Sequence, residues 1–143
     1  MRKLALDLGT KTCGFAITDA DIDIALGLET IHFAENEFDS VIKQIEFYDQ
    51  KYSNISVLVI GLPMRSNGDW SERTHMCFQF AQRLKQHFNR AIYTVNEYGS
   101  TIKAQQSLRQ ANIKRKKVKQ VKDTMSAMII LNEFLEYGGS LVE

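Results

Sequence analysis

The apolar residues of this 143-residue chain first alternate with polar ones, as in β-strands, and later recur at helical spacing. Two short runs, Leu4–Leu8 and Gly14–Thr18, flank a turn that extends from Gly9 to Lys11, and a third run covers Ile24–His32. Short strands in immediate succession pair in antiparallel fashion. We therefore expect the first 32 residues to form three antiparallel strands.

From residue 36 onward, predicted helices alternate with predicted strands along the chain. Apolar residues at helical spacing follow Asn36, which is suited to an N-cap, and the almost wholly apolar run SVLVIGLP from Ser56 predicts a strand that is covered on both faces. Ser71 can cap a second helix, and AIYTVNE predicts a fifth strand. Ser100 or Thr101 is expected to start a further helix before the last one.

This order of elements predicts the fold class. Three antiparallel strands followed by helix, strand, helix, strand and helix give an α/β fold with a five-stranded mixed sheet, three strands antiparallel and then two parallel, and helices on both faces. The chain is long enough to bury a sizeable core. Residues 1–143 contain no linker, low-complexity tract or internal repeat, so we expect a single domain.

The last helix carries an acidic residue on its apolar stripe. Asp123 lies at helical spacing with the apolar residues Ala127, Ile130, Leu131, Phe134 and Leu135. The pattern places Asp123 at the N-terminal end of this helix. A carboxylate there can be a cap that the helix dipole stabilises, or an inward-facing metal ligand, and its position does not decide between the two.

Two further acids fall where a sheet of this kind places its functional sites. Asp7 is near the end of the first predicted strand, and Glu97 is near the end of the fifth. Sites in open α/β sheets gather at the carboxyl ends of central strands, so Asp7, Glu97 and Asp123 can converge although they are far apart in sequence. Three converging carboxylates would repel one another unless cations lay between them.

Mg²⁺ or Mn²⁺ is the cation that suits an all-oxygen site of this kind. Two such ions about 4 Å apart can activate a water molecule and stabilise the leaving oxygen when a phosphodiester is hydrolysed. We therefore expect Asp7, Glu97 and Asp123 to be both the metal ligands and the catalytic residues of a nuclease that uses two of these ions.

The net charge of +1 conceals an uneven distribution. Residues 1–50 contain four Lys and Arg against ten Asp and Glu, and the stretch Arg109–Lys122 contains seven basic residues and no acid. Such a basic stretch is either a contact surface for a polyanion or a solvated loop. The candidate nucleic-acid-binding residues are Lys11, Arg73, Lys114, Arg115, Lys116, Lys117 and Lys119.

Motifs along nearly the whole chain resemble those of a known family. They are LDLGTKTCGFAIT near the start, VIGLP followed by Asn67–Gly68, Glu97 followed by STIKA, and KDTMSAMIILNEFL near the end. In this order they resemble the YqgF family, small bacterial proteins of the RNase H-like fold that are described as pre-16S rRNA nucleases and as Holliday-junction resolvases. The resemblance implies a single RNase H-like nuclease domain with Asp7, Glu97 and Asp123 as its catalytic acids.

The chain departs from the family beside its central acid. Where the family usually has Asp-Glu-Arg, this chain has Asn96, Glu97 and Tyr98, so a flanking acid and a phosphate-binding arginine are missing. Asn96 could still coordinate through its amide oxygen. These two residues also support a rival interpretation, a catalytically silent module of the same fold that binds nucleic acid.

By resemblance alone, the 5′ region of pre-16S rRNA is the favoured substrate, and a four-way DNA junction is the alternative. Symmetric cutting of a junction requires two sites related by a two-fold axis, whereas trimming of rRNA does not, so the chain is expected to be a monomer or a homodimer. The D-x-G-T stretch at Asp7 also resembles the phosphate-binding turn of actin-like ATPases, but those proteins are much longer.

No apolar stretch approaches the roughly 18 residues that a membrane helix needs, and the first residues lack the layout of a signal peptide. We therefore expect a cytoplasmic protein without a membrane partner. Cys13 and Cys77 form no C-x-x-C pair and are expected to be free, buried thiols.

Overall fold

A computed structural model describes residues 1–98 and 115–143 of the chain, with the side chains of residues 115–123 left undescribed. The elements are β1 (Arg2–Leu8), β2 (Thr12–Thr18), β3 (Ala25–His32), α1 (Asp39–Lys51), β4 (Ile55–Met64), α2 (Glu72–His87), β5 (Ala91–Tyr98), α4 (Arg115–Tyr137) and β6 (Ser140–Leu141). The helix that the sequence predicts from Ser100 or Thr101 lies outside the described residues.

The strands form one mixed sheet in the order β3-β2-β1-β4-β5-β6. β1 pairs with β2 and β2 with β3 in antiparallel fashion, whereas β1, β4 and β5 are parallel. This arrangement confirms the predicted α/β class and strand directions. The sheet has six strands rather than five in the described part of the chain, because two residues after α4 pair antiparallel with β5. A two-residue strand is too short to produce a periodic sequence signal.

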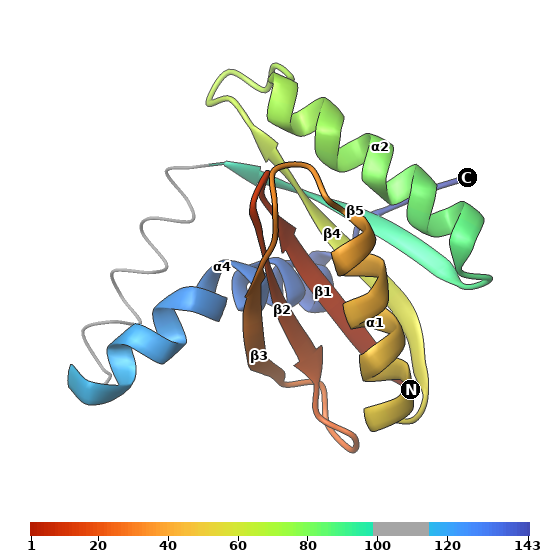
Figure 1. Ribbon diagram of the computed structural model, residues 1–143, viewed down its shortest axis with the longest axis vertical. Helices are drawn as coiled ribbons and strands as arrows, with labels where there is room; N and C mark the ends of the chain where they lie inside the picture. Colours follow the sequence, from red (N-terminus) through yellow and green to blue (C-terminus); the bar gives the residue numbers. More distant parts are fainter. Residues whose placement is uncertain (99–114) are drawn as a thin grey trace.

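Helices cover both faces of the sheet, as the sequence predicts. α1 and α2 lie on one face and α4 crosses the other (Figure 1). The core under α1 and α2 contains large residues such as Phe15, Tyr48 and Phe80. The core under α4 is built from smaller ones, including Ala5 and Ala16. None of the helices in the described residues is long and apolar enough to cross a bilayer.

The helix starts agree only in part with the sequence pattern. Ser71 caps α2, since its hydroxyl accepts the backbone N–H of Thr74 at 3.3 Å and the Thr74 hydroxyl accepts the backbone N–H of Ser71 at 3.0 Å. Asn36 does not cap α1. It adopts a left-handed conformation with φ of 62° in the preceding turn, and Phe38 occupies the N-cap position.

α4 begins earlier than the sequence pattern indicates. It starts at Arg115, so Asp123 lies eight residues inside the helix and the expectation that it marks the N-terminal end is wrong. Lysine and arginine are good helix formers, and their charge hides the helical spacing of Val118 and Val121 among them. Asp123 is therefore too far from the first turn to serve as its cap.

Two glycines let α4 approach the sheet closely. A Cβ atom on Gly27 of β3 would lie 2.4 Å from Oγ1 of Thr124, and one on Gly61 of β4 would lie 2.5 Å from Cδ1 of Ile130. Side chains of α4 thus occupy the space that a larger residue would fill on two different strands. These contacts fix the position of α4 against β3 and β4.

Replacing Gly61 by alanine should destabilise the protein by about 1–3 kcal/mol, because the added methyl group overpacks the interface with Ile130. Urea denaturation would measure the cost. In an Ile130→Val background, which removes the atom nearest to the new methyl group, the same substitution should cost less. Equal costs in the two backgrounds would contradict this account of the packing.

Candidate active site

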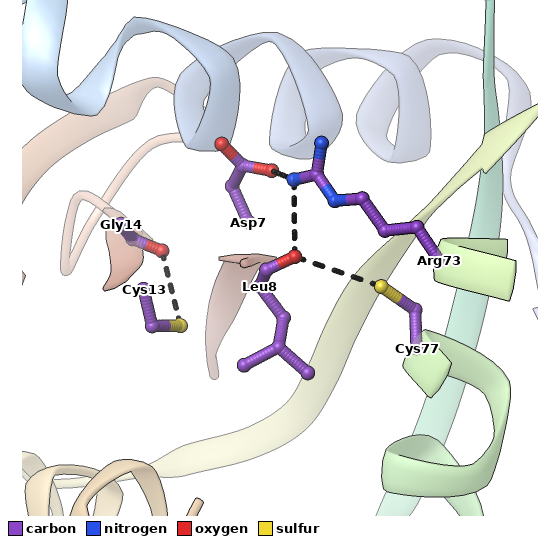
Figure 2. A network of polar contacts seen from close by, with 6 residues as sticks. All are labelled: Asp7, Leu8, Cys13, Gly14, Arg73 and Cys77. Carbon is purple, nitrogen blue, oxygen red and sulfur yellow. Dashed lines mark hydrogen bonds and ion pairs between the residues drawn. The ribbon is translucent and has the colours of Figure 1, made fainter. Parts of the chain in front are cut away.

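Asp7 lies at the carboxyl end of β1, one residue before the strand ends. Alternation along the strand places it on the α4 face, two residues after Ala5, which belongs to the core on that face. Its side chain is 35% exposed, and Oδ1 lies 3.5 Å from Nη2 of Arg73 on α2 (Figure 2). Burial raises the pKa of Asp7 above its ordinary value, and the guanidinium of Arg73 opposes this shift.

Glu97 is the penultimate residue of β5 and is only 5% exposed. Its Oε1 atom is buried and has no hydrogen-bond partner among the described residues. Burial raises the pKa of Glu97 to about 8, and the nearby carboxylates of Glu133 and Asp7 add to the shift. The site therefore holds a carboxyl group whose charged form is not compensated.

The register of the parallel strands brings Asp7 and Glu97 to one place on the sheet. Leu6 pairs with Ile60, so the next residues along β1 and β4, Asp7 and Gly61, are neighbours. Gly61 in turn pairs with Val95 of β5, two residues before Glu97 on the same face. The Cγ atom of Glu97 lies 3.5 Å from the position that a Cβ on Gly61 would take, so its side chain leans over β4.

Glu133 is a fourth acid near the site that the sequence analysis did not identify. It lies on α4, is partly buried and raises the pKa of Glu97. A signal for it exists in the sequence, since Glu133 follows Ile130 by three residues and so shares a helix face with the residue that packs on Gly61. Glu133 lies far from the predicted strand ends and helix start, which are the positions that single out Asp7, Glu97 and Asp123 in the sequence.

Asp123 belongs to α4 by its backbone, and its side chain lies outside the described part of the structure. The stripe predicted with it is confirmed, because Ala127, Ile130 and Leu131 pack against the sheet. Thr124 lies over Gly27, which places this part of α4 above β3. Among the side chains that are described, no three His, Cys, Asp or Glu residues are grouped so that they could hold a metal ion.

The candidate phosphate-binding residues occupy two regions. Lys11 is exposed in the turn between β1 and β2, and this turn is held by a 2.7 Å hydrogen bond from the Gly9 N–H to the Thr12 carbonyl. Lys114 lies outside the described residues. The backbones of Arg115, Lys116, Lys117 and Lys119 form the first turns of α4, and nothing is described of their side chains. Arg73 contacts Asp7 directly.

Asn96 and Tyr98 lie on the other face of β5 from Glu97. Both are exposed, whereas Glu97 between them is buried, as the alternation of a strand requires. The amide of Asn96 is therefore not on the face that carries Glu97 and Asp7, which argues against coordination through its amide oxygen beside Glu97. The departure from the family at these two positions leaves the acids on the α4 face unchanged.

The two cysteines are free and buried, as the sequence predicts. The Cys77 thiol donates to the carbonyl oxygen of Leu8 at 3.6 Å, and Nη2 of Arg73 donates to the same oxygen at 3.1 Å (Figure 2). Leu8 is the last residue of β1. These two donors on α2 thus fix the strand end that carries Asp7.

The raised pKa of Glu97 predicts how stability depends on pH. The folded protein keeps a proton on Glu97 up to pH of about 8, whereas the unfolded chain loses it near the ordinary value of 4.5, so stability falls as pH rises between these values. In EDTA, Glu97→Gln should therefore be more stable than the wild type by about 2–4 kcal/mol at pH of about 9, with little difference at pH of about 4.

Urea denaturation at the two pH values would check this expectation. Glu136→Gln is a matched control, because Glu136 is exposed on α4. It should retain the pH dependence of the wild type. The same loss of stability with pH in the wild type and in Glu97→Gln would show that Glu97 is not the group responsible.

Comparison with known proteins identifies the family of this chain. The family model described as "RuvX: Holliday junction resolvase" matches residues 1–137. A relative from Mycoplasmopsis pulmonis is 43% identical over 136 residues, covering 94% of this chain and 92% of its own, and one from Bacillus thuringiensis is 39% identical over 140 residues, covering 95% and 98%. Both are provisionally named pre-16S rRNA nuclease.

Among solved structures, RuvC of T. thermophilus in complex with a Holliday junction substrate matches 99% of both chains with a TM-score of 0.59 and 9% sequence identity. This likeness shows a shared RNase H-like fold. The match to the family model and the sequence identity to the relatives show the family as well as the fold. The chain belongs to the RuvX family, also known as YqgF.

Proposed function

We propose that this chain is a nuclease that hydrolyses phosphodiester bonds in structured RNA, with Asp7, Glu97 and Asp123 as its catalytic acids and Mg²⁺ or Mn²⁺ as its cofactor. The observation that carries the proposal is the buried carboxyl group of Glu97, whose Oε1 atom lacks a partner among the described residues and which lies near Asp7 and Glu133. A buried acid of this kind is costly unless a cation compensates it.

The donor chemistry of the described acids suits a divalent cation, although fewer than three of these acids are grouped closely enough to hold one without Asp123. All the candidate donors are carboxylate oxygens, which Mg²⁺ and Mn²⁺ prefer, and the unpartnered Oε1 atom of Glu97 is available to one. Asp7 supplies a second carboxylate on the same face of the sheet. Asp123 would supply the third from α4. Glu133 can add charge or order water at the rim of the site.

The protein's own groups would act as follows. Asp7, Glu97 and Asp123 hold the cations, and the packing of α4 on Gly61 excludes water from one side of the site. The exposed Lys11 lies at the same edge of the sheet as Asp7 and can orient a substrate phosphate. Two bound divalent ions would supply activation of the attacking water and stabilisation of the leaving oxygen.

The substrate we favour is the 5′ region of pre-16S rRNA, because relatives that cover nearly the whole chain carry that name. We further propose that residues 1–143 act as one domain in the cytoplasm, as a monomer on RNA. A four-way DNA junction is the second candidate, which the description of the family supports. Symmetric cutting of a junction would need a homodimer. A catalytically silent module is less favoured, because Asn96 and Tyr98 lie on the other face of β5.

Asp7→Asn, Glu97→Gln and Asp123→Asn should each reduce cleavage of structured RNA by about 100-fold or more in Mg²⁺ or Mn²⁺, since each removes a charged oxygen that would hold a cation. Cleavage of an RNA containing the 5′ leader of 16S rRNA would be compared with that of a four-way DNA junction. Asp21→Asn, in the exposed hairpin tip between β2 and β3, is the control and should cut at the wild-type rate. Unchanged rates in Asp7→Asn and Glu97→Gln would rule out this site.

Lys116→Ala and Lys119→Ala should each weaken RNA binding and lower the slope of log affinity against log salt by about 1, because each removes one phosphate contact. Fluorescence anisotropy over a range of KCl concentrations would measure both quantities. Lys43→Ala on α1, which lies across the sheet from α4, should leave the slope unchanged. An unchanged slope in both α4 variants would place the RNA elsewhere on the protein.

A further inference from the structure

Arg73 makes its contacts at the candidate site through a single nitrogen. Nη2 lies 3.5 Å from Oδ1 of Asp7 and donates a 3.1 Å hydrogen bond to the carbonyl oxygen of Leu8. Figure 2 shows the other terminal nitrogen of the guanidinium pointing away from both residues. The planar group that could bind two oxygens side by side therefore uses only part of its capacity here.

The contact between Arg73 and Asp7 is weak enough to be exchanged. Its 3.5 Å length is at the outer limit for a hydrogen bond, and half of the Arg73 side chain is exposed. Partly exposed ion pairs of this kind change an equilibrium by no more than about five-fold. A second cation that bonds Asp7 more strongly can thus displace the guanidinium.

The surroundings of Arg73 stay intact when its side chain moves. The Leu8 carbonyl oxygen also accepts from the Cys77 thiol, so it keeps a donor without Arg73. The start of α2 is fixed separately, by the reciprocal cap of Ser71 and Thr74 and by a hydrogen bond from the Thr74 hydroxyl to the carbonyl of Pro63. Only a side chain has to rotate, and no helix has to shift.

We propose that Arg73 is an exchangeable counter-ion: it neutralises Asp7 in the metal-free protein and leaves when a divalent cation binds there, which frees its guanidinium to bind a phosphate of the nucleic acid. This inference rests on the proposed function, because it takes Asp7 as a metal ligand. The two cations repel each other at Asp7, whereas a guanidinium matches the geometry of a phosphate. Metal binding and nucleic-acid binding are then coupled through one side chain.

Arg73→Gln removes the charge that competes at Asp7. The glutamine is shorter and gives up the hydrogen bond to the Leu8 carbonyl, which keeps the Cys77 thiol as a donor. Arg83→Gln is the matched control, because Arg83 is on the same helix and pairs with Asp39 on α1 away from the candidate site. Both variants lose one positive charge and one ion pair with an aspartate.

The first experiment is titration of each protein with Mn²⁺ by calorimetry in the absence of nucleic acid. Arg73→Gln should bind Mn²⁺ about two- to five-fold more tightly than the wild type, and Arg83→Gln should bind it as the wild type does. Equal affinities in the wild type and Arg73→Gln, with Mn²⁺ binding lost in Glu97→Gln, would overturn the exchange and leave the metal site standing. No binding of Mn²⁺ to the wild type would overturn both proposals.

The second experiment measures binding of an RNA hairpin by anisotropy with and without Ca²⁺, which replaces the catalytic ion so that binding is followed without cleavage. Ca²⁺ should strengthen RNA binding by the wild type and by Arg83→Gln to the same extent. In Arg73→Gln, the factor by which Ca²⁺ raises the affinity for RNA should be at least about two-fold smaller than in the wild type. Equal strengthening in all three proteins would show that Arg73 does not pass from Asp7 to the RNA.

Discussion

The main constraint on this structure is a carboxyl group of β5 that is buried beside other acids. Glu97 is nearly inaccessible, one of its oxygens has no partner among the described residues, and Asp7 and Glu133 both disfavour its charged form. Burying such a group without compensation opposes folding. The rest of the sheet and α4 must therefore supply the stability that this site removes, and a bound cation would relieve the conflict by favouring the charged form of all the acids at once.

The packing of α4 explains how Glu97 stays buried beside the other acids. Small residues on the sheet let the helix come close at two strands, with Thr124 over Gly27 and Ile130 over Gly61. Gly61 is also the residue between Asp7 and Val95 in the strand register, so the absent side chain that admits Ile130 lies next to the stem of Glu97. A larger residue there would push Ile130 and its helix away from the sheet beside the acid. One glycine thus serves the core and the candidate site together.

The sequence predicted what periodicity and local chemistry determine. Alternation gave the strands, the apolar run from Ser56 gave the central parallel strand, and Ser71 gave the start of α2. It did not predict β6, which has too few residues to repeat a pattern, or the early start of α4, where charge conceals the helical spacing. The contact of Arg73 with Asp7 joins residues 66 positions apart, and only the assembled sheet and helix bring them together.

Under the proposed function, the charge distribution along α4 would link nucleic-acid binding to the acids. The helix begins with a basic run that includes Lys116, and it then carries Asp123 and Glu133. At 1.5 Å per residue, Lys116 and Asp123 lie about 10 Å apart along one rigid axis. A phosphate held by the first turns would therefore be placed at a fixed distance from the sheet edge. The contacts of α4 with Gly27 and Gly61 hold the helix against the sheet. The same contacts would therefore determine where the nucleic acid lies relative to Glu97.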